Sequence, residues 1–295
     1  IMAKFLKRYR YPYLFIMPFF ILFLVFQLVP NLWTVYISLT EWNGIGEPRF
    51  TGAQNYSMLF KDYMFWDALK NTVIYWITGV ILILALGLLI SGLLNYNRLR
   101  GKAFFKSATY LPNICAVIAM GIIFSMLFEK NTGLINEVIF AMGGNKVDWL
   151  TGTRFSKIPV IALNVWRNTP WFTMILLSGL LNISPEYYEA AKVDGCNFFR
   201  TFFNIMMPLT KPIATTVVIM ETIWAWNAFM LPLVLTLNNP SSRTLAVGLY
   251  AFKGENTVDW TGIAAGGVIA VIPIILLFIC LQKYFVEGIA GAVKS

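Results

Sequence analysis

One apolar segment of the chain carries polar and aromatic residues at the spacing of a single helical face. They are Asn164, Arg167, Asn168 and Trp171, at positions i, i+3, i+4 and i+7, with Ser178 near the same stripe. Amide and guanidinium groups donate hydrogen bonds to hydroxyl groups, and an indole ring offers a flat apolar surface. This face is therefore a candidate for contact with a polar solute, in a cavity or against a partner subunit.

A second apolar segment adds Glu221, Trp224 and Asn227. Glu221 and Arg167 are the two ionisable residues well inside the apolar segments, where a charge is costly and is a functional candidate by default. A direct ion pair would need tilt or long rotamers, because we expect an offset of roughly 10 Å along the helix axes. The alternatives are a contact across a subunit interface and a purely structural role, with polar groups joining helices and tryptophans filling the core.

The residue types that the chain lacks restrict its chemistry. It has no histidine, which excludes histidine-based catalytic triads and histidine-ligated metal sites. Its three cysteines, Cys115, Cys196 and Cys280, are far apart and lack metal-ligand spacing. No glycine-rich run ends in Gly-Lys-Ser/Thr, so we expect no Walker A site for ATP and no cofactor in this chain. A step driven by ATP would need another polypeptide.

The composition indicates an integral membrane protein built from helices. The 295 residues are 58% hydrophobic and 13% charged, with a mean hydropathy of +0.67, whereas soluble domains are about half apolar. Windows of about 20 apolar residues predict six transmembrane helices. They are residues 13–38, 71–94, 108–128, 158–181, 213–237 and 262–282. Pro170 and Pro232 are expected to break the fourth and fifth helices locally.

Charge and the even number of predicted helices indicate the orientation of the chain. With both termini in the cytoplasm, the inner segments carry the whole net charge of +9 and the outer segments are neutral, as the positive-inside rule expects. The first apolar run is too long for a signal peptide and lacks a small-residue cleavage site, so we expect it to be retained. The predicted parts are an N-terminal segment with the first helix and an outer loop (1–66), a transmembrane domain (67–283) and a cytoplasmic tail (284–295).

The cytoplasmic loop of residues 184–212 is polar and cationic, and we expect it to form two short helices. Ser184 can cap the first helix, and Gly195 can end it in the left-handed conformation that closes many helices. Asn197 can cap the second helix, which is predicted to run to a break at Pro208. Five apolar residues of the second helix fall on one stripe: Phe198, Phe199, Phe202, Phe203 and Met206.

This loop resembles the cytoplasmic signature of ABC importer permeases. The signature is Glu-Ala-Ala, three residues, Gly, nine residues, Ile, one residue and Leu-Pro. The matching residues are Glu189, Ala190, Ala191, Gly195, Ile205 and Pro208. Met207 departs from the usual Leu, which is a mild apolar exchange. The fixed spacing makes the match specific, and the charge distribution independently places this loop in the cytoplasm.

The resemblance extends over most of the chain and narrows to carbohydrate-importer permeases. Four segments look like the first permease subunit of maltose-type systems: LTEWNG (39–44), FTGAQNY (50–56), ALKNT (68–72) and LRGKAFF (99–105). Two later segments, ETIWAWNAFMLP (221–232) and QKYFVEGIAGAVKS (282–295), look more like the second subunit. This mixture leaves open which half of a heterodimer the chain supplies, and a homodimer is the less favoured alternative.

The resemblance implies an all-α type I importer fold in the cytoplasmic (inner) membrane of a bacterium or archaeon, with residues 67–283 as the type 1 transmembrane domain. Its partners would be a second permease, a dimeric cytoplasmic ATPase that binds ATP and Mg, and an extracytoplasmic binding protein. That protein would deliver an oligosaccharide or a related polyol or glycoside. The chain itself would be a transport subunit and no enzyme, and the loop 184–212 would couple it to the ATPase.

The resemblance and the residue chemistry together assign two sets of site residues. The residues expected to couple to the ATPase are Glu189, Ala190, Ala191, Asp194, Gly195, Ile205 and Pro208. In this loop the small alanines would allow close approach of a partner, and the acids would orient it. The residues expected along the substrate pathway are Asn164, Arg167, Trp171, Glu221, Trp224 and Asn227. Sugars are hydroxyl-rich with apolar ring faces, so they suit amides beside aromatic rings.

Two other classes of protein serve as alternatives. An ion-coupled secondary transporter needs an intramembrane carboxylate relay or a broken-helix ion site, and often shows an inverted repeat. One intramembrane carboxylate, Glu221, and no evident repeat argue against it. A membrane enzyme needs clustered acids, a nucleophile with a base, or metal ligands on one face, and the sequence shows no such cluster.

Overall fold

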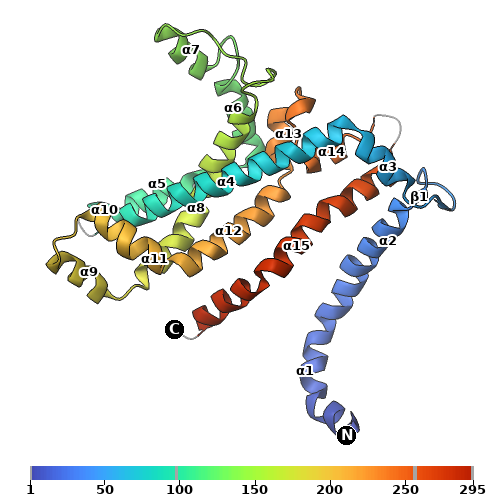
Figure 1. Cartoon of the computed structure of the whole chain (residues 1–295), viewed down its shortest axis with the longest axis horizontal. Coiled ribbons are helices and arrows are strands. Elements are labelled where there is room, and N and C mark those ends of the chain that lie inside the picture. The colour runs from blue at the N-terminus through green and yellow to red at the C-terminus, as the bar shows by residue number, and fades with distance from the viewer. Residues whose placement is uncertain (1, 97–98, 255–257, 294–295) are drawn as a thin grey trace. The chain divides into compact units, whose positions relative to one another are not determined.

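The computed structural model describes residues 2–96, 99–254 and 258–293, with side chains described from residue 10 to 280 within these ranges and at residue 282 (Figure 1). Except for a two-stranded hairpin, β1 (Thr40–Glu41) with β2 (Arg49–Phe50), the regular elements of these ranges are helices, which confirms the predicted all-α class. The chain divides into two compact units. The first contains Ile1–Tyr63 with Leu249–Pro273, and the second Met64–Gly248 with Ile274–Ser295.

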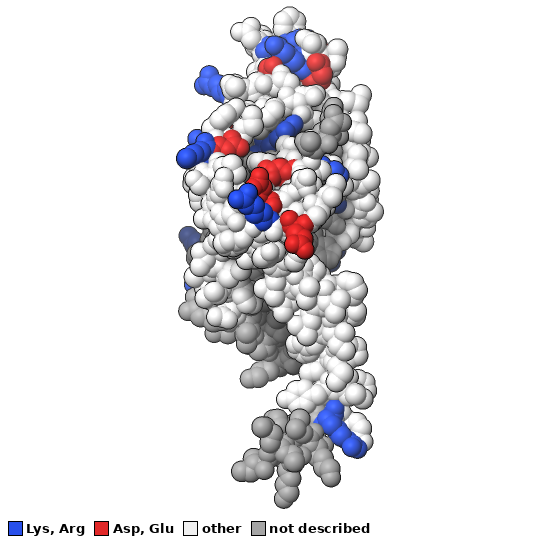
Figure 2. Space-filling model, turned by 90° about the vertical axis from the view of Figure 1, so that its right-hand side faces the viewer, with Lys and Arg blue, Asp and Glu red and all other residues white. Residues whose placement is uncertain are grey.

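The first unit begins with a long apolar helix. It runs through α1 (Met2–Phe23), a π-helical turn η1 (Leu24–Leu28) and α2 (Val29–Ser38). Pro30 lacks the N–H that would continue the regular ladder, and the π turn directly before it accommodates the loss. Residues 11–38 contain no charged side chain. Figure 2 likewise shows Lys, Arg, Asp and Glu gathered on parts of the surface, with wide areas that carry neither sign.

A short helix also belongs to this unit. In α3 (Gln54–Lys61), Asn55 is buried and its Nδ2 donates to the carbonyl oxygens of Ser38 and Thr40 at 2.9 and 2.7 Å. The amide thereby fastens the hairpin to the end of α2. The last helix, α15 (Trp260–Val293), contributes residues to both units, and the predicted tail 284–295 is a continuation of it as far as Val293. Residues 294 and 295 of that predicted tail lie outside the described ranges.

The second unit contains most of the remaining helices (Figure 1). They are α4 (Tyr63–Asn95), α5 (Lys102–Ile114), α6 (Val117–Leu127), α7 (Leu134–Ala141), α8 (Lys157–Leu181), α9 (Pro185–Val193), α10 (Phe198–Thr201), the π turn η2 (Phe202–Met206), α11 (Met207–Leu209), α12 (Lys211–Trp226), α13 (Met230–Thr236), the 3-10 turn η3 (Pro240–Ser242) and α14 (Leu245–Tyr250). The first residue of α4 and the last two of α14 belong to the first unit.

Length and composition support part of the predicted set of spans. Within the described residues, three helices are long and apolar enough to cross a membrane: Arg10–Ser38, Tyr63–Asn95 and Trp260–Cys280. Two bent pairs bring the number to five if each pair is one span. They are Lys102–Ile114 with Val117–Leu127, bent by 93°, and Phe198–Leu209 with Lys211–Trp226, bent by 71°. Helix α8 coincides with the predicted span 158–181 but is not among them, so the number six stays a prediction.

Two of the predicted spans are interrupted. The prediction of a continuous helix over 108–128 is wrong, because Cys115 and Ala116 adopt extended ψ angles of 143° and 130° that end the helical hydrogen-bond ladder. The helix predicted over 213–237 breaks at residues 227–229, between α12 and α13, and not at Pro232. Pro232 lies in the first turn of α13, where its missing N–H costs no hydrogen bond. Pro170 does not interrupt α8, contrary to expectation.

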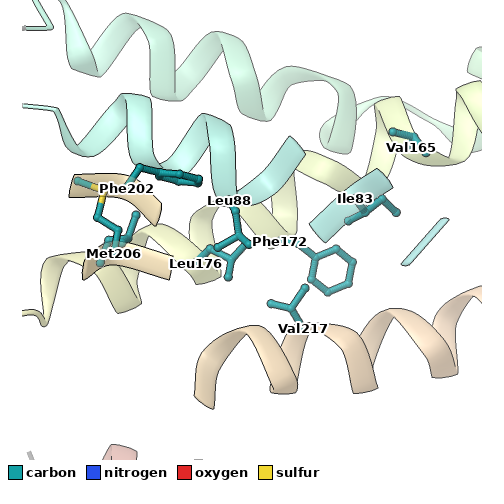
Figure 3. Close-up of a cluster of buried hydrophobic side chains, with 9 residues drawn as sticks. Ile83, Leu88, Val165, Phe172, Leu176, Phe202, Met206 and Val217 are labelled. Carbon is teal, nitrogen blue, oxygen red and sulfur yellow. The ribbon is translucent and has the colours of Figure 1, made fainter. Parts of the chain in front are cut away.

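Two apolar clusters hold the second unit together. The larger one joins α4, α8, α12 and η2, as Figure 3 shows. Its buried members are Ile83, Leu88, Val165, Phe172, Leu176, Leu180, Phe202, Met206 and Val217. The smaller one, Tyr75, Val160, Leu163, Leu231 and Leu235, joins α4 and α8 to α13. Along α8 the residues of the polar stripe therefore lie where one cluster gives way to the other.

Candidate functional site

Three polar residues of α8 are connected to Glu221 by a chain of hydrogen bonds. Arg167 Nη1 donates to Asn168 Oδ1 at 3.4 Å, and Asn168 Nδ2 donates to Asn164 Oδ1 at 2.8 Å. Asn164 Nδ2 then donates to Glu221 Oε1 of α12 at 3.4 Å. We call these four residues the polar relay. Arg167 and Glu221 thus form no ion pair with each other, and two amides join them instead.

The carboxylate at the end of the relay is buried. Glu221 is 1% exposed, and its Oε2 has no hydrogen-bond partner among the described residues; the same holds for Arg167 Nε. A buried polar atom without a partner is costly and calls for an explanation in function or in solvation. Glu221 is therefore hidden from the surface, and its contact on α8 is the half-buried Asn164.

A glycine of α4 allows the relay to form. A Cβ on Gly79 would lie 3.0 Å from Asn164 Nδ2 and 3.3 Å from Glu221 Oε1, which is tighter than ordinary van der Waals contact. From α5, Asn113 Nδ2 donates to the carbonyl oxygen of Arg167 at 3.5 Å. The sequence analysis missed Gly79 and Asn113, because a glycine or an asparagine within an apolar helix does not reveal which helix it faces.

An aromatic pair lies on the surface of the same two helices. The ring centroids of Trp171 (α8) and Trp224 (α12) are 6.2 Å apart at 38°, and the two residues are 36% and 41% exposed. Buried Phe172 supports Trp224 from 5.3 Å. The structure thus brings together two residues predicted for the pathway from separate segments. Asn227 lies apart from the relay at the end of α12, where its Nδ2 donates to the carbonyl oxygen of Ile223 at 2.8 Å.

The loop 184–212 contains the two predicted helices. Helix α9 (Pro185–Val193) is closed by Gly195, whose φ of +68° is in the left-handed region. The amides of Cys196 and Gly195 donate to the carbonyl oxygens of Ala191 and Lys192 at 2.9 and 3.1 Å, which is the Schellman arrangement. Asn197 Oδ1 accepts from the amide of Arg200 at 2.9 Å, so the predicted cap of the second helix is confirmed. Ser184 occupies the N-cap position of α9 without a side-chain capping bond.

The signature residues of this loop differ in exposure. Glu189, Ala190, Asp194, Gly195 and Pro208 are exposed, and Ile205 is half-buried. Ala191 is only 3% exposed. The expectation that both alanines face a partner is therefore wrong for Ala191, which packs within this chain.

The second helix of the loop also differs from its prediction. Phe202 and Met206 are buried in the larger cluster, with Phe198 packed against it, whereas Phe199 and Phe203 are exposed. The single predicted aromatic stripe is thus two stripes. The break comes after Leu209 rather than at Pro208, and the π turn η2 precedes the proline. A π turn there accommodates the missing proline N–H without ending the helix.

Tyr188 ties α9 to α4 and α8. It is half-buried, and its hydroxyl accepts from Asn95 Nδ2 of α4 at 3.1 Å and donates to the carbonyl oxygen of Leu180 of α8 at 3.2 Å. Burial raises the pKa of Tyr188, and the hydrogen bond from Asn95 opposes this shift. The sequence analysis missed Tyr188, whose only signal is its place in the first helix of the loop.

The arrangement is that of a membrane transport subunit: packed apolar helices with a capped, exposed loop helix and a polar relay between two of the helices. Residues 85–291 match the family described as binding-protein-dependent transport system inner membrane component. The chain belongs to this family. The match confirms the resemblance to ABC importer permeases and the type I fold, and it identifies a multi-pass transport subunit of the inner membrane rather than an enzyme or an ion-coupled transporter.

Relatives along nearly the whole chain agree with this family. The chain is 33% identical over 278 residues to the trehalose/maltose transport system permease protein MalF of Thermococcus litoralis, covering 94% of this chain and 92% of that protein. It is 32% identical to the lactose transport system permease protein LacF of Rhizobium radiobacter, covering 84% and 85%. A solved bacterial ABC transporter involved in alginate import has the same fold, with a TM-score of 0.77 at 18% identity over 97% of this chain and 98% of that chain.

Proposed function

We propose that the chain is one permease subunit of an ATP-driven importer that receives a saccharide, an oligosaccharide or a related polyol or glycoside, from an extracytoplasmic binding protein. Membership of a binding-protein-dependent family supports the mode of delivery. The names of relatives, which include trehalose/maltose, lactose and arabinooligosaccharide permeases, support the saccharide. The observation that carries the proposal is the exposed, rigidly closed helix α9, which suits transmission of force from a separate ATPase.

Helix α9 is the proposed contact with the ATPase. Exposed Ala190 allows close approach of a partner, and exposed Glu189 and Asp194 orient it. Buried Ala191 and the hydroxyl bonds of Tyr188 tie the helix to the bundle, and the Schellman closure at Gly195 fixes its end. A push on α9 is therefore transmitted to the transmembrane helices rather than absorbed by a loop.

Ile205 in η2 and Pro208 in α11 complete the proposed coupling segment, directly before α12. The chain has no Walker A sequence, so ATP and Mg bind to the partner ATPase subunits. ATP-driven closure of these subunits moves α9, and the bundle alternates between outward-open and inward-open states.

The substrate pathway runs over the faces of α8 and α12 that carry the relay and the aromatic pair. Sugar ring faces pack on the exposed indoles of Trp171 and Trp224, and hydroxyl groups bind to donors and acceptors nearby. Arg167 and Asn164 supply these groups on α8, and exposed Asn227 supplies another at the break after α12. Glu221 acts from beneath through Asn164.

The assembly contains a second, different permease, a dimeric cytoplasmic ATPase and the binding protein. Both termini of this chain lie in the cytoplasm, which the +9 charge of the inner segments supports. Residues 67–283 form the type 1 transmembrane domain, and residues 1–66 add the first span and an outer loop. An even number of spans agrees with this topology, and the proposed number is six, with α8 as the fourth span.

Uptake by a reconstituted assembly tests the proposal. The chain is solubilised in mild detergent with its co-purifying subunits, which are identified, and is reconstituted into liposomes with the binding protein. We expect uptake of maltose, trehalose or lactose that requires both ATP and the binding protein, and we expect Glu189→Lys to retain assembly and lose ATP-dependent uptake. Uptake driven by an ion gradient without ATP would refute the proposal.

A further inference from the structure

The hydrogen bonds of the polar relay all run in one direction. Arg167 donates to Asn168, Asn168 donates to Asn164, and Asn164 donates to Glu221. A guanidinium has only donors and a carboxylate only acceptors, so the two ends fix which way each amide between them is turned. With both amides oriented, the Oδ1 and Nδ2 of Asn164 face defined neighbours, and the guanidinium of Arg167 is held from one side.

The relay depends on close contact with α4. Gly79 is the α4 residue that faces the bond between Asn164 and Glu221, and a Cβ at this position would press on both of its atoms. The nearer of the two atoms is the amide nitrogen of Asn164, which is also the donor of the bond to Glu221. Even an alanine at position 79 would therefore displace the amide or lengthen its bond.

Each end of the relay lies beside one of the two tryptophans of the aromatic pair. Arg167 and Trp171 are four residues apart on α8, so they are neighbours on one helical face. Glu221 and Trp224 are three residues apart on α12, and they are likewise neighbours. The buried carboxylate and the exposed rings thus belong to the same two helix segments, although Glu221 itself is hidden from the surface.

We propose that Gly79, Asn168 and Glu221 are positioning residues that set the orientation of Asn164 and Arg167 at the saccharide pathway. This inference rests on the proposed function. The relay holds the two donors in one orientation relative to the rings of Trp171 and Trp224, so hydroxyl groups at one set of positions on the sugar are recognised. As a consequence, the permease itself discriminates between sugars, in addition to any discrimination by the binding protein.

A pair of glycine variants in α4 provides the first test. Gly79→Ala places a methyl group on the relay, whereas Gly87→Ala places one 3.0 Å from Leu176 Cδ1, the flexible end of an apolar side chain in the same helix interface. Uptake of whichever of maltose, trehalose or lactose the wild-type assembly accepts is compared with uptake of its monodeoxy derivatives. We expect Gly79→Ala to reduce the discrimination by about tenfold, corresponding to one hydrogen bond, and Gly87→Ala to retain it.

Four further variants separate positioning from general packing. Glu221→Gln keeps an acceptor oxygen for Asn164 and should retain discrimination, whereas Glu221→Leu should lose it. In an Asn164→Ala background, Gly79→Ala should cause little further loss, because Asn164 Nδ2, the nearer of the two atoms that its methyl group would meet, is absent. Additive losses in this double variant, equal effects of the Gln and Leu variants, or unchanged discrimination in Gly79→Ala would overturn the inference.

The behaviour of the wild-type assembly separates a failure of the proposed function from a failure of the positioning role. If it takes up none of these saccharides with ATP and the binding protein, the proposed function fails and the positioning role fails with it. If it transports and discriminates while Gly79→Ala behaves like Gly87→Ala, the proposed function stands and only the positioning role is refuted.

Discussion

A hydrogen bond joins Asn95, the last residue of α4, to Tyr188 in the middle of the loop helix α9, with 3.1 Å between the amide nitrogen and the phenolic oxygen. The same hydroxyl donates to the carbonyl oxygen of Leu180 near the end of α8. Both α4 and α8 supply side chains to the larger apolar cluster. One hydroxyl group therefore connects the exposed helix of the loop to the two helices that organise the second unit.

Removing this hydroxyl should weaken the connection without removing the ring. We expect Tyr188→Phe to lower the free energy of unfolding by about 1 kcal/mol, since two hydrogen bonds are lost and Asn95 and the Leu180 carbonyl lose a partner. It should also lower saccharide uptake per ATP hydrolysed, because α9 transmits less of its movement. Thermal unfolding in detergent and paired uptake and hydrolysis assays measure the two effects.

The neighbouring tyrosine provides a matched control for this variant. Tyr187 is 53% exposed, so Tyr187→Phe removes the same group one residue away without removing the link to α4 and α8. It should leave both measurements close to wild type. Equal behaviour of the two phenylalanine variants would contradict the role assigned to Tyr188.

Gly195 allows a second prediction, which concerns backbone conformation alone. Its φ is +68°, and a Cβ there would meet no atom within 4 Å, so Gly195→Ala adds strain without a steric clash. We expect destabilisation of roughly 1 kcal/mol, the usual cost of placing a residue with a Cβ in the left-handed region. Gly267→Ala is the control, because a Cβ there also meets open space but φ is not positive. A lower unfolding midpoint for the first variant alone is the expected result.

The sequence predicts the parts of this protein that depend on local chemistry. Apolar run length places the long helices, because crossing a bilayer requires about 20 apolar residues in a row. The closure at Gly195 and the cap at Asn197 are predicted correctly, because a left-handed turn and a side-chain cap depend on the residues directly beside them. The stripe of Asn164, Arg167 and Trp171 follows from helical periodicity alone.

The features that depend on contacts between helices are not predictable in this way. The breaks at residues 115–116 and 227–229 are stabilised by packing of the short helices that follow them. Gly121 of α6, for example, meets Val234 of α13 at a separation that no larger residue would allow. Gly79, buried Ala191 and Tyr188 likewise have roles that depend on a neighbour far along the chain. The prediction that Pro170 breaks α8 is wrong, because surrounding helices stabilise a membrane helix that contains proline.

The turn after α6 should respond to pH. Backbone N–H groups hold the pKa of Glu129 below its usual value, with that of Thr132 contributing most, and Asn131 donates at 2.6 Å. A carboxyl whose pKa is lowered by folding stabilises the turn above its unfolded pKa of about 4.3, and this contribution is lost as pH falls through the folded pKa. We therefore expect the amides of residues 131 and 132 to lose hydrogen-exchange protection on acidification, after correction for intrinsic rates. In Glu129→Gln that acid dependence should vanish, and its persistence would contradict this assignment.

The last prediction concerns the contact of α4 with η2, where the loop 184–212 meets the bundle. A Cβ on Gly92 would lie 2.9 Å from the ring of Phe202, which is buried and stacked on Phe198 with centroids 6.1 Å apart. The ring cannot move freely, so Gly92→Ala should overpack this site and destabilise the protein by about 1 to 3 kcal/mol. Phe202→Leu shortens the side chain that the new methyl group meets. The double variant should therefore be less destabilised than the sum of the single changes, and strict additivity in unfolding measurements would show that Gly92 and Phe202 do not form the contact that joins α4 to η2.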